Sequence, residues 1–354
     1  MTVVLSALAT ANPARYATQE EICAFLEAHF PMEPDERRLY RELLLDGPIR
    51  GRYIAVDVDE EICSQDPDVL IARFAKHARR IAARAALAAL EQAGLKPSQI
   101  EGLVVNTCTG YLCPGLSSYL LEDLGLPAFT SVLDLMGMGC GGAIPNLEAA
   151  CRMIQSGAKQ AVLCLSVEIC SATFFLGPDP DLIVSNSIFA DGASAAVLQA
   201  NPNGDPTGGL ARFLDFESVT LPKHREQLRY TTREGRLRNV LTRNVPVIGA
   251  KAVAQAVQRL LDRNAFSMDE IDHWVLHPGG TQVLRAVEKR LGLTSQTLRF
   301  SYDTFREYGN MSSPSVMFVL SKTLREARPR TGDKALLISF GAGFTAFATL
   351  VEFA

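Results

Sequence analysis

Short apolar runs alternate with segments of helical periodicity along most of the chain, which is the pattern of a layered α/β protein. The apolar run at residues 2–11 predicts a first strand, because Asn12 and Pro13 end it and no Lys or Arg precedes it as in a signal peptide. Further strands are predicted at residues 102–107, 160–167, 193–198, 272–276, 334–339 and 344–352, and helices at residues 69–93, 250–264 and 315–325.

The helix predicted at residues 69–93 is rich in alanine and arginine and has recognisable ends. Asp66-Pro67-Asp68 is a helix-start signal, and Gly94 is a stop signal.

A Pro/Gly-rich segment at residues 201–209 is the clearest linker in the chain. The order of strands and helices repeats loosely after it. We therefore predict two similar α/β halves, residues 1–200 and 210–354.

Composition limits the possible partners and compartments. A chain of 354 residues with 47% apolar and 21% charged residues can bury a large core. Its net charge of -4 argues against nucleic acid or an anionic membrane as the main partner, and no run reaches the roughly 18 apolar residues of a membrane helix. Eight cysteines without a CxxC pair or zinc spacing indicate reduced thiols and a cytoplasmic location. No metal, nucleotide or flavin motif is present.

Cys140 is the first candidate for chemistry. It lies in a glycine-flanked stretch that ends a strand-like run and opens a helix-like one. Unpaired N–H groups and the helix dipole at such a place favour a thiolate. The glycines leave space for a bulky thioester.

Two later segments supply possible partners for this thiol. His277 ends a short apolar strand and is followed by Pro278, Gly279 and Gly280. Asn310 lies in Tyr-Gly-Asn-Met-Ser-Ser, just before a predicted helix, where an isolated asparagine would most simply be a turn or cap residue.

The three contexts together resemble the type III polyketide synthases, the chalcone synthase-like family of the thiolase superfamily, in their bacterial form. Further matches, such as Cys-Thr-Gly-Tyr at 108–111 and Phe-Ala-Asp-Gly at 189–192, extend the resemblance over essentially the whole chain. It implies the five-layered αβαβα thiolase fold and a homodimer. It also implies Cys140 as nucleophile, with His277 and Asn310 as the other catalytic residues.

The resemblance assigns further residues as well. Phe189 is the gatekeeper between the CoA tunnel and the cavity, and the second gatekeeper position of the plant enzymes falls on Asn239. Cavity positions fall on Cys108, Cys170 and Thr173, and Cys113 takes the place of the residue that reaches into the partner subunit's cavity; Gly341 and Gly343 shape the cavity through the backbone. For CoA binding we predict Arg38, Arg41, Gly279 and Gly280.

The expected reaction uses CoA thioesters and no other cofactor. An acyl-CoA starter loads on Cys140 and is extended with malonyl-CoA by decarboxylative Claisen condensation. Small residues at the cavity positions favour a medium- or long-chain starter that closes to an alkylpyrone or alkylresorcinol. A malonyl-primed aromatic product of the tetrahydroxynaphthalene type is the alternative. A ketoacyl synthase III-like enzyme, a papain-like hydrolase and a non-condensing acyl-CoA-binding homologue fit the three motifs less well.

Overall fold

A computed structural model describes residues 1–58, 60–201 and 208–354. Nine strands pair in the order β11-β12-β13-β8-β1-β7-β6-β4-β5. Their bounds are β1 Thr2–Ala11, β4 Gly102–Asn106, β5 Ser131–Leu135, β6 Ala161–Ile169, β7 Asp191–Asn201, β8 Ala211–Thr220, β11 His273–Leu276, β12 Lys334–Gly341 and β13 Thr345–Phe353. β1 pairs along its length with β7 and meets β8 at Val4 and Leu5, so it joins two halves of the sheet system.

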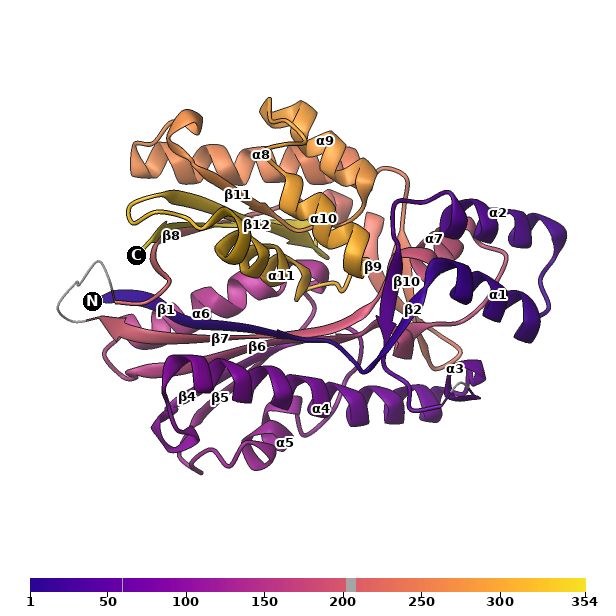
Figure 1. Ribbon diagram of the computed structural model, residues 1–354, viewed down its shortest axis with the longest axis horizontal. Coiled ribbons are helices and arrows are strands. Elements are labelled where there is room, and N and C mark those ends of the chain that lie inside the picture. Colours follow the sequence, from indigo (N-terminus) through magenta and orange to yellow (C-terminus); the bar gives the residue numbers. More distant parts are fainter. Residues whose placement is uncertain (59, 202–207) are drawn as a thin grey trace.

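Helices separate and cover these two halves. α6, Ala143–Gln155, and α11, Ser315–Lys322, lie between them, as Figure 1 shows. α4, Pro67–Ala93, and α5, Leu116–Asp123, cover one outer face, while α8, Val245–Asn264, and α9, Thr281–Leu291, cover the other. The predicted five-layered αβαβα fold is confirmed.

The long helix α4 shows how the sequence builds one outer layer. Asp66 caps its start by accepting from two backbone N–H groups, and Gly94 ends it in the left-handed conformation, as predicted. Its buried stripe includes Phe74, Ile81 and a row of alanines, which lets the helix lie close against β1, β6 and β7.

A group of smaller elements packs at one end of the layers and builds the walls of the site (Figure 1). It comprises β2 Arg15–Thr18, α1 Gln19–His29, α2 Pro34–Leu45, β3 Gly51–Ile54, α3 Glu60–Cys63, α7 Pro180–Ile188, β9 Leu228–Arg233 and β10 Arg236–Leu241. α10, Arg299–Tyr308, packs against β3 and α11.

The predicted linker at residues 201–209 lies mostly outside the described residues, since 202–207 are not described. The division of the chain at this linker stays a prediction. Among the described helices, none combines the length and apolar character needed to cross a membrane.

Candidate active site

Cys140 lies in a tight turn, Gly139–Gly141, between β5 and α6, as the sequence pattern indicated. The end of β12 presses against this turn. A Cβ on Gly341 would lie 2.0 Å from the Met138 carbonyl oxygen and 3.1 Å from the Cys140 nitrogen, so only glycine fits there. The predicted backbone role of Gly341 therefore has a steric basis.

The Cys140 thiol faces a hydroxyl group. Ser312 Oγ lies 3.3 Å from Cys140 Sγ, and Ser312 is held at a φ of 58°, which few non-glycine residues adopt. Burial raises the pKa of Cys140 to about 12; the Ser312 hydroxyl opposes this rise and Glu168 adds to it. Burial of Cys140 thus acts against the thiolate that we expected at the helix terminus.

His277 follows directly after β11, which is paired in parallel with β12, and its backbone N–H donates to Ile338 O. Its ring is 1% exposed and meets the Phe340 ring edge to face. Burial lowers the pKa of His277 to about 3, so the imidazole is neutral.

Asn310 is fixed on both sides of its amide. Its Oδ1 accepts from the Ser312 N–H at 2.8 Å, and its Nδ2 donates to Gly279 O at 3.3 Å. The oxygen end is thereby defined, and one amide hydrogen is left for a ligand. Since Gly279 follows His277 by two residues, this bond ties the Asn310 amide to the His277 loop.

Phe189 forms a backbone bridge with Asn310. The Asn310 N–H donates to Ile188 O, and the Asn310 carbonyl oxygen accepts from the Ala190 N–H. The buried Arg52 guanidinium also donates to Phe189 O at 2.6 Å. The predicted gatekeeper Phe189 and the predicted catalytic residue Asn310 are therefore parts of one hydrogen-bonded unit.

Glu168 is a buried carboxylate that sequence reasoning did not assign. It accepts from Ser313 Oγ at 2.6 Å, Cys108 N at 2.9 Å and Thr109 Oγ1 at 2.9 Å, and its Oε1 lies 3.5 Å from Ser312 Oγ. Burial raises its pKa and these hydrogen bonds oppose the rise. Because Ser312 has one hydroxyl proton, its hydroxyl donates either to Glu168 or to Cys140, not to both at once.

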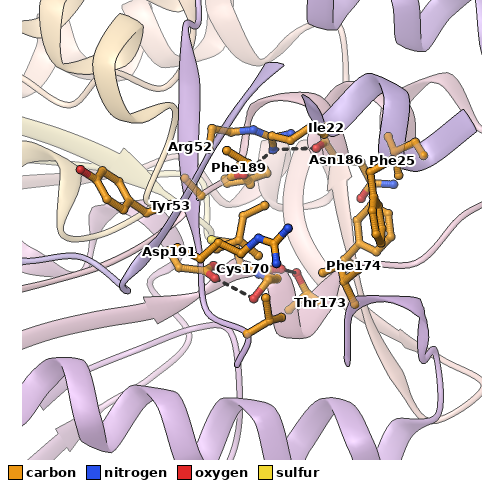
Figure 2. A pocket seen from close by; sticks show the side chains of 18 of the residues that line it. Ile22, Phe25, Arg52, Tyr53, Cys170, Thr173, Phe174, Asn186, Phe189 and Asp191 are labelled. Carbon is orange, nitrogen blue, oxygen red and sulfur yellow. Dashed lines mark hydrogen bonds between the residues drawn. The ribbon is translucent and has the colours of Figure 1, made fainter. Parts of the chain in front are cut away.

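Two cavities adjoin these residues. The first, here called the nucleophile cavity, has a volume of about 310 Å³ and is lined by Cys140, Cys108, Tyr111, Met136, Arg229, Tyr230 and Asn239 among others. The second, here called the apolar cavity, has about 560 Å³ and is lined by Ile22, Phe25, Leu26, Arg52, Ile54, Val56, Cys170, Thr173, Phe174, Leu182, Ser185, Phe189 and Asn239 among others. In Figure 2, Ile22, Phe25 and Phe174 lie on one side of the apolar cavity and Tyr53 lies on the other. Cys170, Thr173 and Phe189 lie between these two sides.

The remaining predicted residues do not line either cavity. Cys113 is exposed. Gly280 precedes α9 with a φ of 148°, and Gly343 has a φ of 124° after β12. Arg38 is exposed and paired with Asp35, whereas Arg41 donates two hydrogen bonds to Glu27, and neither lines the two cavities.

Some of the site residues that we did not predict have a recognisable signal in the sequence. Ser312 and Ser313 follow Asn310 within the quoted motif, and Glu168 is a lone acid in the apolar run of β6, which is itself a sign of a special environment. Arg229 and Tyr230 lie in a hairpin with no such sign. Within the described ranges, no group of three His, Cys, Asp or Glu side chains is placed to hold a metal ion.

Comparison with known proteins identifies the family. Residues 57–212 match the family described as FAE1/Type III polyketide synthase-like protein, and residues 216–353 match the chalcone and stilbene synthases, C-terminal domain. A 3,5-dihydroxyphenylacetyl-CoA synthase of Streptomyces toyocaensis is 33% identical over 89% of this chain and 83% of its own length. An alpha-pyrone synthesis polyketide synthase-like protein of Mycobacterium tuberculosis is 26% identical over 99% of this chain and 91% of its own.

Comparison with solved structures supports the same family. The crystal structure of PKS-I from the brown alga Ectocarpus siliculosus superposes with a TM-score of 0.90 at 26% identity, covering 100% of this chain and 98% of that one. Sequence, fold and the Cys140, His277 and Asn310 contexts together show that this chain belongs to the type III polyketide synthases, a family of acyltransferases with the thiolase fold.

Proposed function

We propose that this enzyme loads a medium- or long-chain acyl-CoA on Cys140, extends it with malonyl-CoA, and closes the product to an alkylpyrone or alkylresorcinol. The observation that carries the proposal is the apolar cavity beside Phe189. Its volume of about 560 Å³ lies within the range of about 300–1,000 Å³ of ligand sites. α1 contributes Ile22, Phe25 and Leu26 to its walls, and polar groups such as Arg52, Asn186 and Asp191 also line it.

Loading begins with a neutral pair of residues. The Cys140 sulfur attacks the thioester carbonyl carbon while its proton passes to the His277 imidazole. The tetrahedral intermediate then expels CoA thiolate, the acyl group stays on Cys140 as a thioester, and the proton taken from Cys140 stays on His277 Nε2. The high pKa of Cys140 and the low pKa of His277 keep both groups neutral until substrate arrives.

Extension requires stabilisation of an enolate. When malonyl-CoA loses CO2, negative charge develops on its thioester oxygen. The His277 Nε2–H, which carries the proton taken from Cys140, and the free Asn310 Nδ2–H are the two proposed donors to this oxygen. The enolate carbon then attacks the acyl carbonyl on Cys140, and the Cys140 sulfur leaves as the new carbon–carbon bond forms and takes its proton back from His277. The reaction as proposed uses no cofactor beyond the CoA thioesters.

A second function is supported by different observations. The relative from Streptomyces toyocaensis bears the name 3,5-dihydroxyphenylacetyl-CoA synthase, and Arg229 brings a guanidinium to the nucleophile cavity. A cation there favours a carboxylate-bearing intermediate. The alternative product is therefore an aromatic polyketide built from malonyl-CoA alone.

One experiment separates the two functions. Purified protein is incubated with malonyl-CoA and a ladder of starters from acetyl- to palmitoyl-CoA, and products are identified by mass spectrometry beside a Cys140→Ala control. Cys140-dependent alkylpyrones or alkylresorcinols from long starters support the proposal. Product from malonyl-CoA alone, with no incorporation of any starter, overturns it in favour of the aromatic alternative.

We also propose a homodimer. β5 is an edge strand with β4 as its neighbour, and large apolar side chains are exposed on and around it, namely Tyr111, Phe129, Val132, Leu133 and Met136. An exposed apolar edge of this kind is typical of an interface. The exposed Cys113 lies in the loop before α5. Light scattering tests this proposal: wild type should have the mass of two chains, and Val132→Arg should shift it toward one; a monomeric wild type contradicts it.

A further inference from the structure

We propose that Ser313 is a positioning residue for the reaction, which acts on Cys140 through its neighbour Ser312. The Ser313 hydroxyl occupies the Glu168 carboxylate, and the Ser312 proton is thereby directed to the sulfur of the nucleophile. The inference rests on the proposed function only in taking Cys140 as the acylated residue, and it holds for either product.

Two hydroxyls and a thiol lie around one oxygen of Glu168. Ser313 Oγ donates to Oε1 at 2.6 Å and Cys108 Sγ donates at 3.3 Å, whereas Ser312 Oγ lies 3.5 Å away. Ser312 Oγ lies 3.3 Å from Cys140 Sγ and 3.5 Å from Cys108 Sγ. Because closer donors occupy Glu168 Oε1, the Cys140 sulfur is the nearest acceptor left for the Ser312 proton.

The direction of the Ser313 bond is fixed from behind by two buried amides. Val104 O and Leu165 O can only accept, and Asn146 Nδ2 donates to them at 3.3 and 2.9 Å. The same Nδ2 donates to Asn106 Oδ1 at 2.9 Å, so Asn106 Nδ2 is turned to Ser313 Oγ, at 2.8 Å. Since Ser313 accepts from an N–H there, its single proton is left for the carboxylate.

The other end of the chain is fixed by backbone groups as well. Glu168 Oε2 accepts from the Cys108 and Thr109 N–H groups at 2.9 and 3.2 Å, and these groups can only donate. Burial raises the pKa of Glu168, and the hydrogen bond from Ser313 is the first of those that oppose the rise. The chain therefore runs in one direction, from the amides to Glu168 as the final acceptor.

The same amides pack against the start of α6, next to the nucleophile. A Cβ on Gly142 would lie 2.6 Å from Asn106 Nδ2, so this amide touches the residue that caps the helix. Asn146 lies one turn further along α6, and its N–H donates to Gly142 O at 3.1 Å. One network thus holds both Ser313 and the helix that follows Cys140.

A hydroxyl directed at the sulfur stabilises charge during the reaction. Negative charge develops on the Cys140 sulfur as its proton passes to His277, and a donated hydrogen bond lowers the energy of that charge. Without Ser313, Glu168 Oε1 would lose its closest donor. The Ser312 hydroxyl would turn to that oxygen, since a carboxylate is a stronger acceptor than a neutral thiol, and the sulfur would be left without its donor.

The test is a double-mutant cycle of Ser313→Ala and Ser312→Ala. The readout is the rate at which iodoacetamide alkylates Cys140 at one fixed pH. All proteins carry Cys113→Ser, which removes the exposed thiol, and peptide mapping assigns the label. Formation of lauroyl-Cys140 from lauroyl-CoA is recorded by mass spectrometry on the same proteins.

Ser166→Ala is the matched control. Ser166 Oγ donates to Asn106 Oδ1 at 2.7 Å, so this variant removes a buried hydroxyl of the same network without touching the bond from Asn106 to Ser313. Ser313→Cys is the second variant in case Ser313→Ala does not fold, because a thiol keeps the volume and is only a weak donor.

Ser313→Ala should slow both alkylation and lauroyl-Cys140 formation by about tenfold, the size of one hydrogen bond to a charged group. Ser166→Ala should keep the wild-type rates. In the Ser312→Ala background, Ser313→Ala should cause no further loss, because it acts only through Ser312.

Wild-type alkylation rates in the folded Ser313 variants overturn the proposal. Equal slowing with and without Ser312 also overturns it, because Ser313 would then act through the general structure. Failure of the wild type to form lauroyl-Cys140 overturns the proposed function instead, since iodoacetamide reports on the Cys140 thiol without any acyl substrate.

Discussion

The nucleophile cavity and the apolar cavity lie next to each other but are built in opposite ways. Around the first, Cys140, Ser312, Glu168 and Asn310 are linked by directional hydrogen bonds, so a change of one group disturbs the others. The second has one wall of aliphatic and aromatic side chains, including Ile22, Phe25 and Phe174, and its hydrogen-bonded groups, such as Arg52, lie on the side near Phe189. The contrast indicates that the chemistry is sensitive to single atoms, whereas starter choice can change gradually with cavity size.

The largest effect that distinguishes the two cavities should come from Cys140→Ala. Without the sulfur no acyl-enzyme forms, and we expect complete loss of the acyl mass shift and of product, measured by mass spectrometry. Binding of lauroyl-CoA, measured by calorimetry, should persist because the apolar cavity is unchanged.

Cys151→Ala is the matched control for this variant, since Cys151 is buried in the core on α6 and should not be acylated. Product from the Cys140→Ala protein would contradict the assigned nucleophile.

Asn310→Asp should separate the two steps that share the nucleophile cavity. A carboxylate cannot donate to the enolate oxygen and repels its charge, so malonyl-CoA decarboxylation should fall by about 100–1,000-fold. Release of CO2 from malonyl-CoA measures this step. Loading of Cys140 by the starter, recorded on the same variant, serves as the internal control; equal loss of both steps would argue for misfolding.

The pH dependence of Cys140 alkylation tests the neutral state of the thiol. With a pKa of about 12, the thiolate fraction rises as pH increases, so the rate with iodoacetamide should grow roughly tenfold per pH unit from neutral pH to pH 10 without a plateau. Peptide mapping in a Cys113→Ser background, which removes the exposed thiol, isolates the signal. A plateau near neutral pH would instead indicate the thiolate that the helix terminus suggested from sequence.

Features that depend on a short local motif could be predicted from the sequence, whereas features that depend on distant segments could not. Cys140, His277 and Asn310 were proposed as catalytic because each lies in a short motif and the three motifs together resemble one family, whereas α4 was predicted from Asp66 and Gly94 at its ends. The thiolate that we expected at Cys140 stays a prediction, because burial by distant segments raises the pKa of this thiol and a local sequence pattern does not report that burial. The apolar cavity was not predictable in detail, since residues as far apart as Ile22, Phe174 and Asn239 form it only after folding.

Filling the apolar cavity should give the smallest and most graded effect. Each buried methylene contributes about 0.8 kcal/mol, so kcat/KM of the wild type should rise about fourfold per added carbon of the starter until the cavity is full. Ile22→Phe places a larger ring on α1 at the cavity wall, and its optimum should move to a shorter starter. Below that optimum the fourfold steps should remain, and CO2 release from malonyl-CoA should stay at the wild-type rate, because the donors His277 and Asn310 lie outside the altered wall. If kcat/KM instead stayed flat across the ladder in both proteins, the tail would not be entering the apolar cavity, and the division of labour between the two cavities would be wrong.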